Sequence, residues 1–238
     1  GAQRPPSTWH EILRNRIINR WLNIAMADKQ TKQERKRGRG RPKSDVAPDT
    51  DVILLAAARI FAEHGFDGAT TREVARTAGV NVALLSYHYG SKQGLWEAVV
   101  DRIAVAVVSR LESLPDTGLR PVLESVIDLF CDHPEAASFI AREMTQAGER
   151  PEYLHDALGT PIHRHVVPIV AQAARDGLLG EADPELFFFT FSHALTMTIA
   201  MRGFVERYAP VVSEDPGFRD HLKRALIPAT LVRTVSAE

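Results

Sequence analysis

The residues best suited to specific chemistry lie just after a glycine bend at Gly79-Val80. From Asn81 to Tyr89 the chain offers small apolar side chains together with hydroxyl, phenol and imidazole groups. Apolar groups of this size can contact thymine methyl groups, and hydrogen-bond donors at helix ends suit phosphate contacts. The pattern therefore predicts a short helix that reads the major groove of duplex DNA.

A reading helix has to be held on a small helical scaffold, and the preceding sequence supplies one. Apolar residues recur at helical spacing between 53 and 64, and Gly65 is expected to end that first helix. Thr70 and Glu73 form a capping box, which predicts a second helix over 70–78. The glycine bend then separates two short helices, as in a helix-turn-helix.

The remaining sequence also reads as helices, so we predict an all-α fold. A long fourth helix is expected from Ser91 to Pro115, and proline and glycine stops divide the rest into about five more. We assign 1–48 to a basic, flexible N-terminal extension and 49–95 to a three-helix helix-turn-helix DNA-binding domain. The range 96–238 is assigned to a C-terminal helical ligand-binding and dimerisation domain.

Composition is that of an ordinary soluble globular protein. The chain has 238 residues, of which 45% are apolar and 25% charged, with a formal net charge of −1. Cys131 is the single cysteine, which excludes an intrachain disulfide and fits a reducing cytoplasm. The longest apolar-leaning run, 186–201, is too short and too polar to span a bilayer. We therefore expect a cytoplasmic protein with no membrane partner.

Positive charge is concentrated at the N-terminus. Residues 1–48 carry 12 Lys and Arg against 4 Asp and Glu, whereas 49–238 carry 17 against 26. We call 29–43 the basic arm. Its segment Arg39-Gly40-Arg41-Pro42-Lys43 resembles the core of an AT-hook, which places Arg39 and Arg41 in an A·T-rich minor groove. A passive solubilising tail is the alternative interpretation.

The first 25 residues have an apolar pattern of their own. Apolar residues of 7–26 fall at helical spacing, which suits a basic amphipathic helix on a membrane or a partner. Met26 is the first methionine, and the residues after it suit the start of a native chain. Our preferred interpretation is that 1–25 is upstream or vector-derived sequence.

Short motifs between 53 and 99 occur in a fixed order. They are Ile53, Ala57, Phe61, Gly65-Phe66, Ala69-Thr70-Thr71-Arg72-Glu73-Val74-Ala75, Ala78-Gly79-Val80, Leu85, Tyr87-His88-Tyr89 and Ser91-Lys92. This series resembles the TetR family of bacterial transcriptional regulators. The resemblance implies a three-helix DNA-binding domain, a connecting fourth helix, a variable ligand-binding domain and a homodimer formed by the last two helices.

Carried over position by position, the resemblance also implies roles for single residues. The implied phosphate contacts are Thr71, His88 and Lys92. The implied base-side positions are Arg72, Val82, Ala83, Leu84 and Ser86. Tyr87 and Tyr89 are added as hydrogen-bond donors at the helix end, with core aromatics as the alternative. The family often has Tyr, Phe and Pro where this chain has Ser86, Tyr89 and Gly90, so the operator sequence stays open.

Two further surfaces are expected in the C-terminal domain. A ligand cavity among its helices has the candidate lining residues Phe139, Arg142, Glu143, His163, His193 and Met197, with core packing and surface ion pairs as their alternative. The segment 184–208 is apolar nearly all round, which suggests burial against both the body and a second subunit. The predicted dimer interface is Phe187, Phe191, Leu195, Phe218, Leu222, Ala225, Leu226 and Ala229, and a wholly internal core helix is its alternative.

Enzymatic chemistry lacks its usual signatures. The segment His163-Arg164-His165 places its two rings on different sides of a helix, and no HExxH or CxxC spacing is present. Nor does the sequence contain a GxSxG elbow, a Walker loop or a dinucleotide-binding GxGxxG. We therefore predict no enzyme activity, no metal and no cofactor.

The sequence predicts a ligand-responsive transcriptional regulator, and a homodimeric repressor is our preferred interpretation. Its two reading helices would enter successive major grooves of a near-palindromic operator, and a small-molecule effector would release it. The alternative is an architectural DNA-binding protein that prefers A·T-rich sites through the basic arm and has no effector. A third interpretation is a helical ligand-binding or catalytic domain without DNA function.

Overall fold

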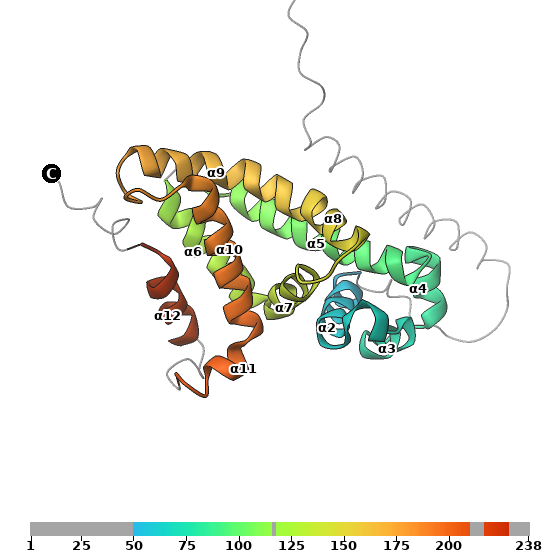
Figure 1. Cartoon of the computed structure of the whole chain (residues 1–238). Helices are drawn as coiled ribbons and strands as arrows, with labels where there is room; N and C mark the ends of the chain where they lie inside the picture. Colours follow the sequence, from blue (N-terminus) through green and yellow to red (C-terminus); the bar gives the residue numbers. More distant parts are fainter. Residues whose placement is uncertain (1–49, 116–117, 210–216, 229–238) are drawn as a thin grey trace, which may run out of the picture.

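The computed structural model describes residues 50–115, 118–209 and 217–228, and these form helices joined by short turns (Figure 1). The predicted all-α class is confirmed, since the described residues contain no β-strand. Arg39, Arg41 and Ala229 lie outside the described residues, as does the rest of the N-terminal extension. None of the described helices has both the length and the apolarity needed to cross a bilayer.

Three helices build the N-terminal domain. They are α2 (Thr50–Gly68), α3 (Thr71–Thr77) and α4 (Val82–Tyr89). The helical backbone is interrupted at Gly65, as predicted, by a φ of 71° and a ψ of 172°, a conformation that glycine adopts without strain. A further short helical turn, which was not predicted, then extends α2 to Gly68.

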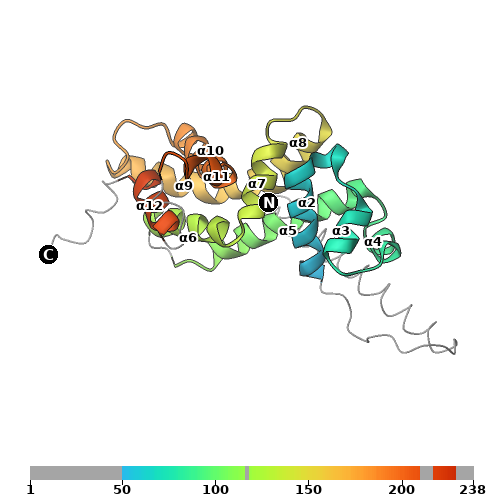
Figure 2. The same ribbon diagram turned by 90° about the horizontal axis from the view of Figure 1, so that it is seen from below.

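A long connecting helix and a helical body follow. The connecting helix is α5 (Lys92–Glu112), which begins at the predicted cap Ser91. The body consists of α6 (Leu119–Asp132), α7 (Pro134–Glu143), α8 (Glu149–Leu154), a π-helical segment η1 (His155–Gly159), α9 (Thr160–Arg175), α10 (Pro184–Ala200), α11 (Arg202–Val205) and α12 (Gly217–Leu226). In Figure 2, α2 to α4 lie at one end of the molecule and α9, α10 and α12 at the other, with α5 and α7 between them.

A fully buried aromatic cluster joins the two ends. Phe139 of α7 packs against Phe61 of α2 and Trp96 of α5, with ring centroids 6.3 and 5.7 Å apart. The three side chains are at most 1% exposed. The apolar core is therefore continuous across the predicted boundary at 95, and the division into 49–95 and 96–238 stays a prediction.

One ion pair ties the start of α2 to α5. Arg102 Nε lies 2.7 Å from Asp51 Oδ1, and the hydrogen bond from Arg102 lowers the pKa of Asp51 below its ordinary value of 3.8. Desolvation opposes this shift and Coulombic attraction adds to it. The pair therefore contributes to stability above pH 3.8, and this contribution is lost as the pH falls through the folded-state pKa.

We expect Asp51→Asn to lower the free energy of unfolding at pH 7 by at most about 0.5 kcal/mol, because both side chains are partly exposed to water. Urea denaturation at pH 7, 5 and 3 measures the effect. The difference between the variant and the parent should shrink as the pH falls below 3.8. A difference that grows in acid would contradict the assigned direction.

Candidate DNA-binding surface and effector cavity

Side-chain caps define the two short helices. Thr70 Oγ1 accepts a hydrogen bond from the amide of Glu73 at 3.2 Å, which is one half of the predicted capping box. The Glu73 carboxylate instead faces His64 at 3.4 Å and Arg76 at 3.9 Å. Asn81 Oδ1 caps α4 by accepting from the amide of Ala83 at 2.9 Å. Local capping thus sets where the reading helix begins.

Gly94 lies where the end of α4 and the start of α5 come close together. A Cβ at Gly94 would lie 2.2 Å from the carbonyl oxygen of Tyr89, so only glycine fits in this first turn of α5. The helix end at Gly90, with a φ of 74°, therefore comes close to the start of α5. These contacts hold α4 against α5.

The reading helix has one buried side and one exposed side. Leu85 and Tyr89, four positions apart, are 1% and 7% exposed and anchor α4 in the core. Ala83, Ser86 and Tyr87 are exposed, and their spacing of three and four residues places them together on the opposite face. We call these three residues the α4 outer face. An exposed helix face on a buried anchor is the geometry needed to enter a groove.

Val82 and Leu84 depart from the prediction. We expected both to be exposed for contact with thymine methyl groups, but each is only partly exposed and packs against the core. Because α4 has two turns, its residues on either side of the buried anchor also help to hold it. Of the three predicted apolar base contacts, only Ala83 is exposed.

Tyr89 and Lys92 are corrected from DNA contacts to positioning residues. The Tyr89 side chain lies in the core. The Lys92 ammonium donates to the backbone carbonyls of Phe66, Ala69 and Asp67 at 2.7, 3.2 and 3.3 Å. It thereby satisfies acceptors at the end of α2, and its three donors have partners within the domain.

The remaining predicted contacts lie at the start of α3 and the end of α4. Arg72 is exposed, whereas Thr71 and His88 are partly exposed, and the His88 ring stands edge-on to Tyr87 at 5.3 Å. Their contact with DNA stays a prediction. Residues 50–95 contain four Lys and Arg and four Asp and Glu, so this domain has no net positive charge. The excess of positive charge lies instead in the basic arm.

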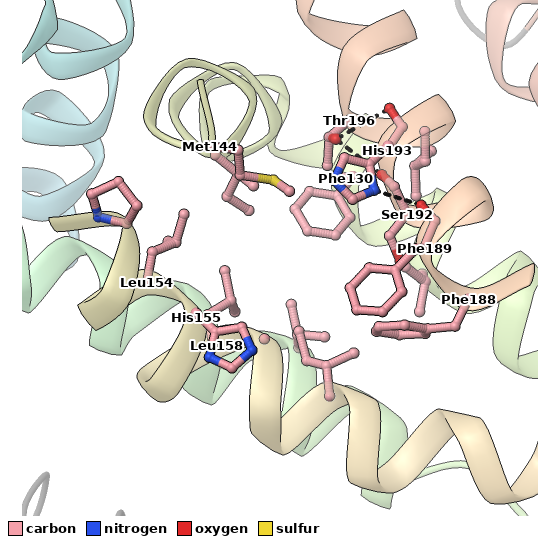
Figure 3. A pocket seen from close by; sticks show the side chains of 17 residues that line it. Phe130, Met144, Leu154, His155, Leu158, Phe188, Phe189, Ser192, His193 and Thr196 are labelled. Atoms are coloured by element: carbon pink, nitrogen blue, oxygen red, sulfur yellow. Dashed lines mark hydrogen bonds between the residues drawn. The ribbon is translucent and has the colours of Figure 1, made fainter. Parts of the chain in front are cut away.

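An apolar cavity of about 280 Å³, which we call the central cavity, lies inside the C-terminal body (Figure 3). Side chains reach it from three directions: Met144 after α7, Leu154 to Leu158 on α8 and η1, and Phe188 to Thr196 on α10. The polar residues of its lining are His155, Ser192, His193 and Thr196. The π-helical segment η1 forms part of the wall, and such turns often occur at functional sites.

Only one predicted ligand residue, His193, lines this cavity. Phe139 is fully buried against the aromatic cluster. The Arg142 guanidinium donates to the carbonyls of Ala62 and Glu63 near the end of α2, at 3.2 and 3.4 Å. Five of the six assignments therefore need correction.

The other three residues are engaged elsewhere or point away. Glu143 is 1% exposed and pairs with Arg150, whose Nε lies 3.2 Å from its Oε2. His163 Nε2 lies 2.5 Å from Glu185 Oε2, and Met197 is 40% exposed. Helical spacing identified their helices correctly but not the neighbours that each side chain meets. Leu154, Leu158 and Phe130, which do line the cavity, carried no signal beyond apolarity.

A second cavity of about 300 Å³ lies between α2 and α5. Val107 and Phe130 line both cavities, so a single layer of side chains separates them. Asp51, Arg102, His133 and Glu135 are the charged or titratable residues of its lining. The central cavity thus has a wall that continues to the DNA-binding end of the molecule.

A buried ion pair links the cavity wall to α2. Arg150 pairs with Glu143, and its guanidinium carbon also lies 4.3 Å above the Phe66 ring. The Lys92 ammonium lies 4.6 Å from the same ring. Because Pro151 and Leu154 line the central cavity, the α8 segment touches both the cavity and the end of α2.

We expect Arg150→Ala to lower the free energy of unfolding by about 2 kcal/mol, because it strands the buried Glu143 carboxylate without its partner. Urea denaturation at pH 7 measures the loss. The double variant Arg150→Ala with Glu143→Gln should recover part of it by removing the stranded charge. Equal stability of the single and double variants would show that Glu143 does not depend on this pair.

The predicted dimer residues lie mainly inside the subunit. Phe191, Leu195, Phe218 and Leu222 are at most 7% exposed, and Phe187 and Leu226 are partly buried against the core. Ala225 is exposed. The exposed large apolar residues of this region are instead Leu186, Phe189, Met197, Met201, Phe204 and Tyr208. The segment 184–208 has two apolar sides as predicted, but most of the residues first assigned to the dimer interface pack inward.

Among the described residues, no group of three His, Cys, Asp or Glu side chains is placed to hold a metal ion. An outward-facing reading helix on a helical body with an apolar cavity defines a helix-turn-helix protein of the DNA-binding class. Residues 53–99 match the family model described as bacterial regulatory proteins, tetR family. The family match confirms, for residues 53–99, the resemblance seen in the sequence.

Individual relatives extend the comparison. The chain is 28% identical over 104 residues to the HTH-type transcriptional repressor NicS of Pseudomonas putida, covering 41% of this chain and 49% of the repressor. It is 28% identical over 138 residues to the HTH-type transcriptional dual regulator CecR of Shigella flexneri, covering 50% and 61%. The matched region thus spans about half to three fifths of these relatives.

Solved structures resemble this chain over most of its length. The transcriptional regulator FadR from Bacillus subtilis, in complex with stearoyl-CoA, superposes with a TM-score of 0.58 at 15% identity. The match covers 75% of this chain and 98% of FadR. At this identity the likeness shows the fold alone.

Proposed function

We propose that this protein is a DNA-binding transcriptional regulator that a small-molecule effector controls, and that it acts as a homodimeric repressor in the bacterial cytoplasm. The observation that carries the proposal is the α4 outer face, Ala83, Ser86 and Tyr87, exposed above the buried anchors Leu85 and Tyr89. The family match of 53–99 supports it. Thr71 and His88 add contacts to the DNA backbone, and Arg72 adds a base-side contact.

Dimerisation supplies the second reading helix. The exposed apolar residues of α10 and α11, among them Leu186, Met197 and Phe204, fit a partner of the same kind better than water. A two-fold dimer would present two α4 helices to successive major grooves. Sedimentation that shows a monomer at micromolar concentration would exclude this arrangement.

The central cavity is the proposed effector site. Its wall is continuous with the cavity beside α2 through Val107 and Phe130, and its α8 side touches the end of α2 through Arg150. A ligand that fits the cavity better in one arrangement of these helices than in another changes operator affinity by that difference in binding.

Protection of genomic fragments tests the function. The full chain should protect a short near-palindromic sequence, and cleavage of the flanking DNA should remain unaffected. Broad protection of A·T-rich DNA without a palindrome would favour an architectural protein. If the chain shifted the electrophoretic mobility of no DNA duplex at low salt, the proposal would be wrong.

The basic arm is proposed to supply most of the electrostatic attraction, since residues 50–95 are balanced in charge. Arg39 and Arg41 are assigned to a minor groove beside the operator. We expect deletion of 29–43 to weaken operator binding and to flatten its dependence on salt, by about 0.9 in the logarithmic slope for each phosphate that the arm neutralises. Binding measured between 50 and 200 mM salt gives this slope, and an unchanged slope would identify the arm as a passive tail.

A further inference from the structure

The polar groups of the central cavity define what a ligand has to offer. Three of them, Ser192, His193 and Thr196, come from adjacent turns of α10. The fourth, His155, has a side chain that is 70% exposed and pairs with Asp156, so it belongs to the mouth. His193 is itself exposed, whereas Ser192 is partly exposed and Thr196 is buried. Apart from His155, the polar groups that a ligand meets therefore all come from α10.

His193 presents a hydrogen-bond acceptor. Its Nδ1 lies 2.6 Å from the backbone carbonyl oxygen of Phe189, one turn earlier in α10. Because a carbonyl only accepts, Nδ1 carries the proton and donates it. In a neutral imidazole the other nitrogen, Nε2, is then an acceptor. No hydrogen bond within the described parts of the chain engages Nε2, and the ring centroid lies 6.1 Å from that of Phe189 on the α10 side of the cavity (Figure 3).

Thr196 also presents lone pairs. Its hydroxyl donates to the carbonyl oxygen of Ser192 at 2.9 Å, so the oxygen faces other groups only as an acceptor. The Ser192 hydroxyl can rotate to donate or accept. The cavity therefore has two fixed hydrogen-bond acceptors, His193 Nε2 and Thr196 Oγ1, and one hydroxyl, that of Ser192, which can take either role. Such a set is complementary to a ligand that donates a hydrogen bond.

Charge and size narrow the ligand further. None of the residues that line the cavity is Asp, Glu, Lys or Arg. A carboxylate or an ammonium group would lose its water there without gaining a formally charged partner, which is costly. A cavity of roughly 150 Å³ holds a benzene ring, so the 280 Å³ found here suits about two fused rings.

We infer that the effector of this protein is a neutral, lipophilic molecule of about two-ring size that carries one hydroxyl or phenol group, which donates to Nε2 of His193. The inference rests on the proposed function, because it takes the central cavity as the effector site. The stearoyl-CoA held by FadR is a different class of ligand, with a long chain and a polyanionic head.

Three matched probes test the inference by titration calorimetry on the full chain. The probe 2-naphthol carries the donor, 2-methoxynaphthalene keeps the oxygen without the donor, and 2-naphthoate carries a charge. We expect 2-naphthol to bind roughly 3- to 10-fold more tightly than the methyl ether, as one hydrogen bond provides, and 2-naphthoate to bind most weakly. Tighter binding of 2-naphthoate, equal binding of the first two, or no binding of any probe would overturn the inference.

Substitutions then locate the donor contact. His193→Phe keeps an aromatic ring and removes Nε2, so it should abolish the preference for 2-naphthol over the methyl ether. His193→Gln keeps an acceptor oxygen and should retain part of that preference, which covers the case in which the Phe variant fails to fold. His163→Phe is the matched control, because His163 faces Glu185 outside the cavity and the preference should not change. A preference that survives His193→Phe would place the contact elsewhere.

The probe titrations test the effector inference, and the DNA measurements test the DNA-binding proposal, so either can be wrong without the other. Operator protection is read without any ligand, so a cavity that rejects all three probes leaves the DNA-binding proposal intact. Conversely, selective 2-naphthol binding by a chain that protects no palindrome would support the cavity chemistry while removing its regulatory role.

Discussion

Ala83→Glu is expected to weaken operator binding by at least about 100-fold. Ala83 is exposed in the first turn of α4, on the α4 outer face, so its replacement brings a negative charge to base edges and phosphates. Each poor contact of this kind costs about 1–3 kcal/mol, and a dimer has two copies. Quantitative footprinting on the protected palindrome measures the loss.

The same substitution should leave the fold unchanged, which makes the readout specific to DNA. A glutamate in the first turn of a helix interacts favourably with the helix dipole, so α4 is not weakened. Ala182→Glu, in the exposed turn before α10, is the matched control and should bind the operator like the parent chain. Full operator affinity in Ala83→Glu would show that α4 does not read DNA.

Phe139→Ala is expected to lower the free energy of unfolding by about 3–5 kcal/mol. The ring is fully buried between Phe61 of α2 and Trp96 of α5, so its removal leaves a cavity where the two ends of the molecule meet. For a chain of this size the melting temperature should fall by roughly 10 °C. Thermal and urea denaturation measure the change.

Tyr87→Ala is the matched control for that measurement. It removes a ring of similar size that is 49% exposed, and its effect on unfolding without DNA should stay below about 1 kcal/mol. Probe binding distinguishes a structural role of Phe139 from a ligand-binding role. If the role is structural, Phe139→Ala molecules that remain folded keep the preference for 2-naphthol. If Phe139→Ala leaves stability unchanged but abolishes probe binding, Phe139 belongs to the ligand site.

Local sequence determined the helix-turn-helix. Thr70, Asn81 and Ser91 cap the helices that they were predicted to cap, because a cap depends only on a side chain and an amide two or three residues away. The anchor Leu85 could likewise be identified from its spacing. Gly65 likewise interrupts the first helix where this was predicted, because glycine adopts a positive φ without strain, and only the short turn that follows to Gly68 was not predicted.

Residues with long-range partners were assigned less well. Lys92 was expected to reach phosphate, but its ammonium meets carbonyls more than 20 residues earlier in the chain. Arg142 likewise caps α2 from about 80 residues away. A cation in the sequence carries no mark of which acceptors the fold will bring to it.

The sequence by itself determined the all-helical class, the place of the reading helix and the separation of a basic arm from an acidic body. Only the tertiary structure decided which apolar side chains form the core, the cavity or the outer surface. On α10, for example, Phe191 is buried in the core, Leu195 lines the cavity and Met197 is exposed. Helical periodicity fixes how such residues are spaced around the axis of α10. The packing of α7, α9 and α12 decides which side of that helix faces the core, the cavity or solvent.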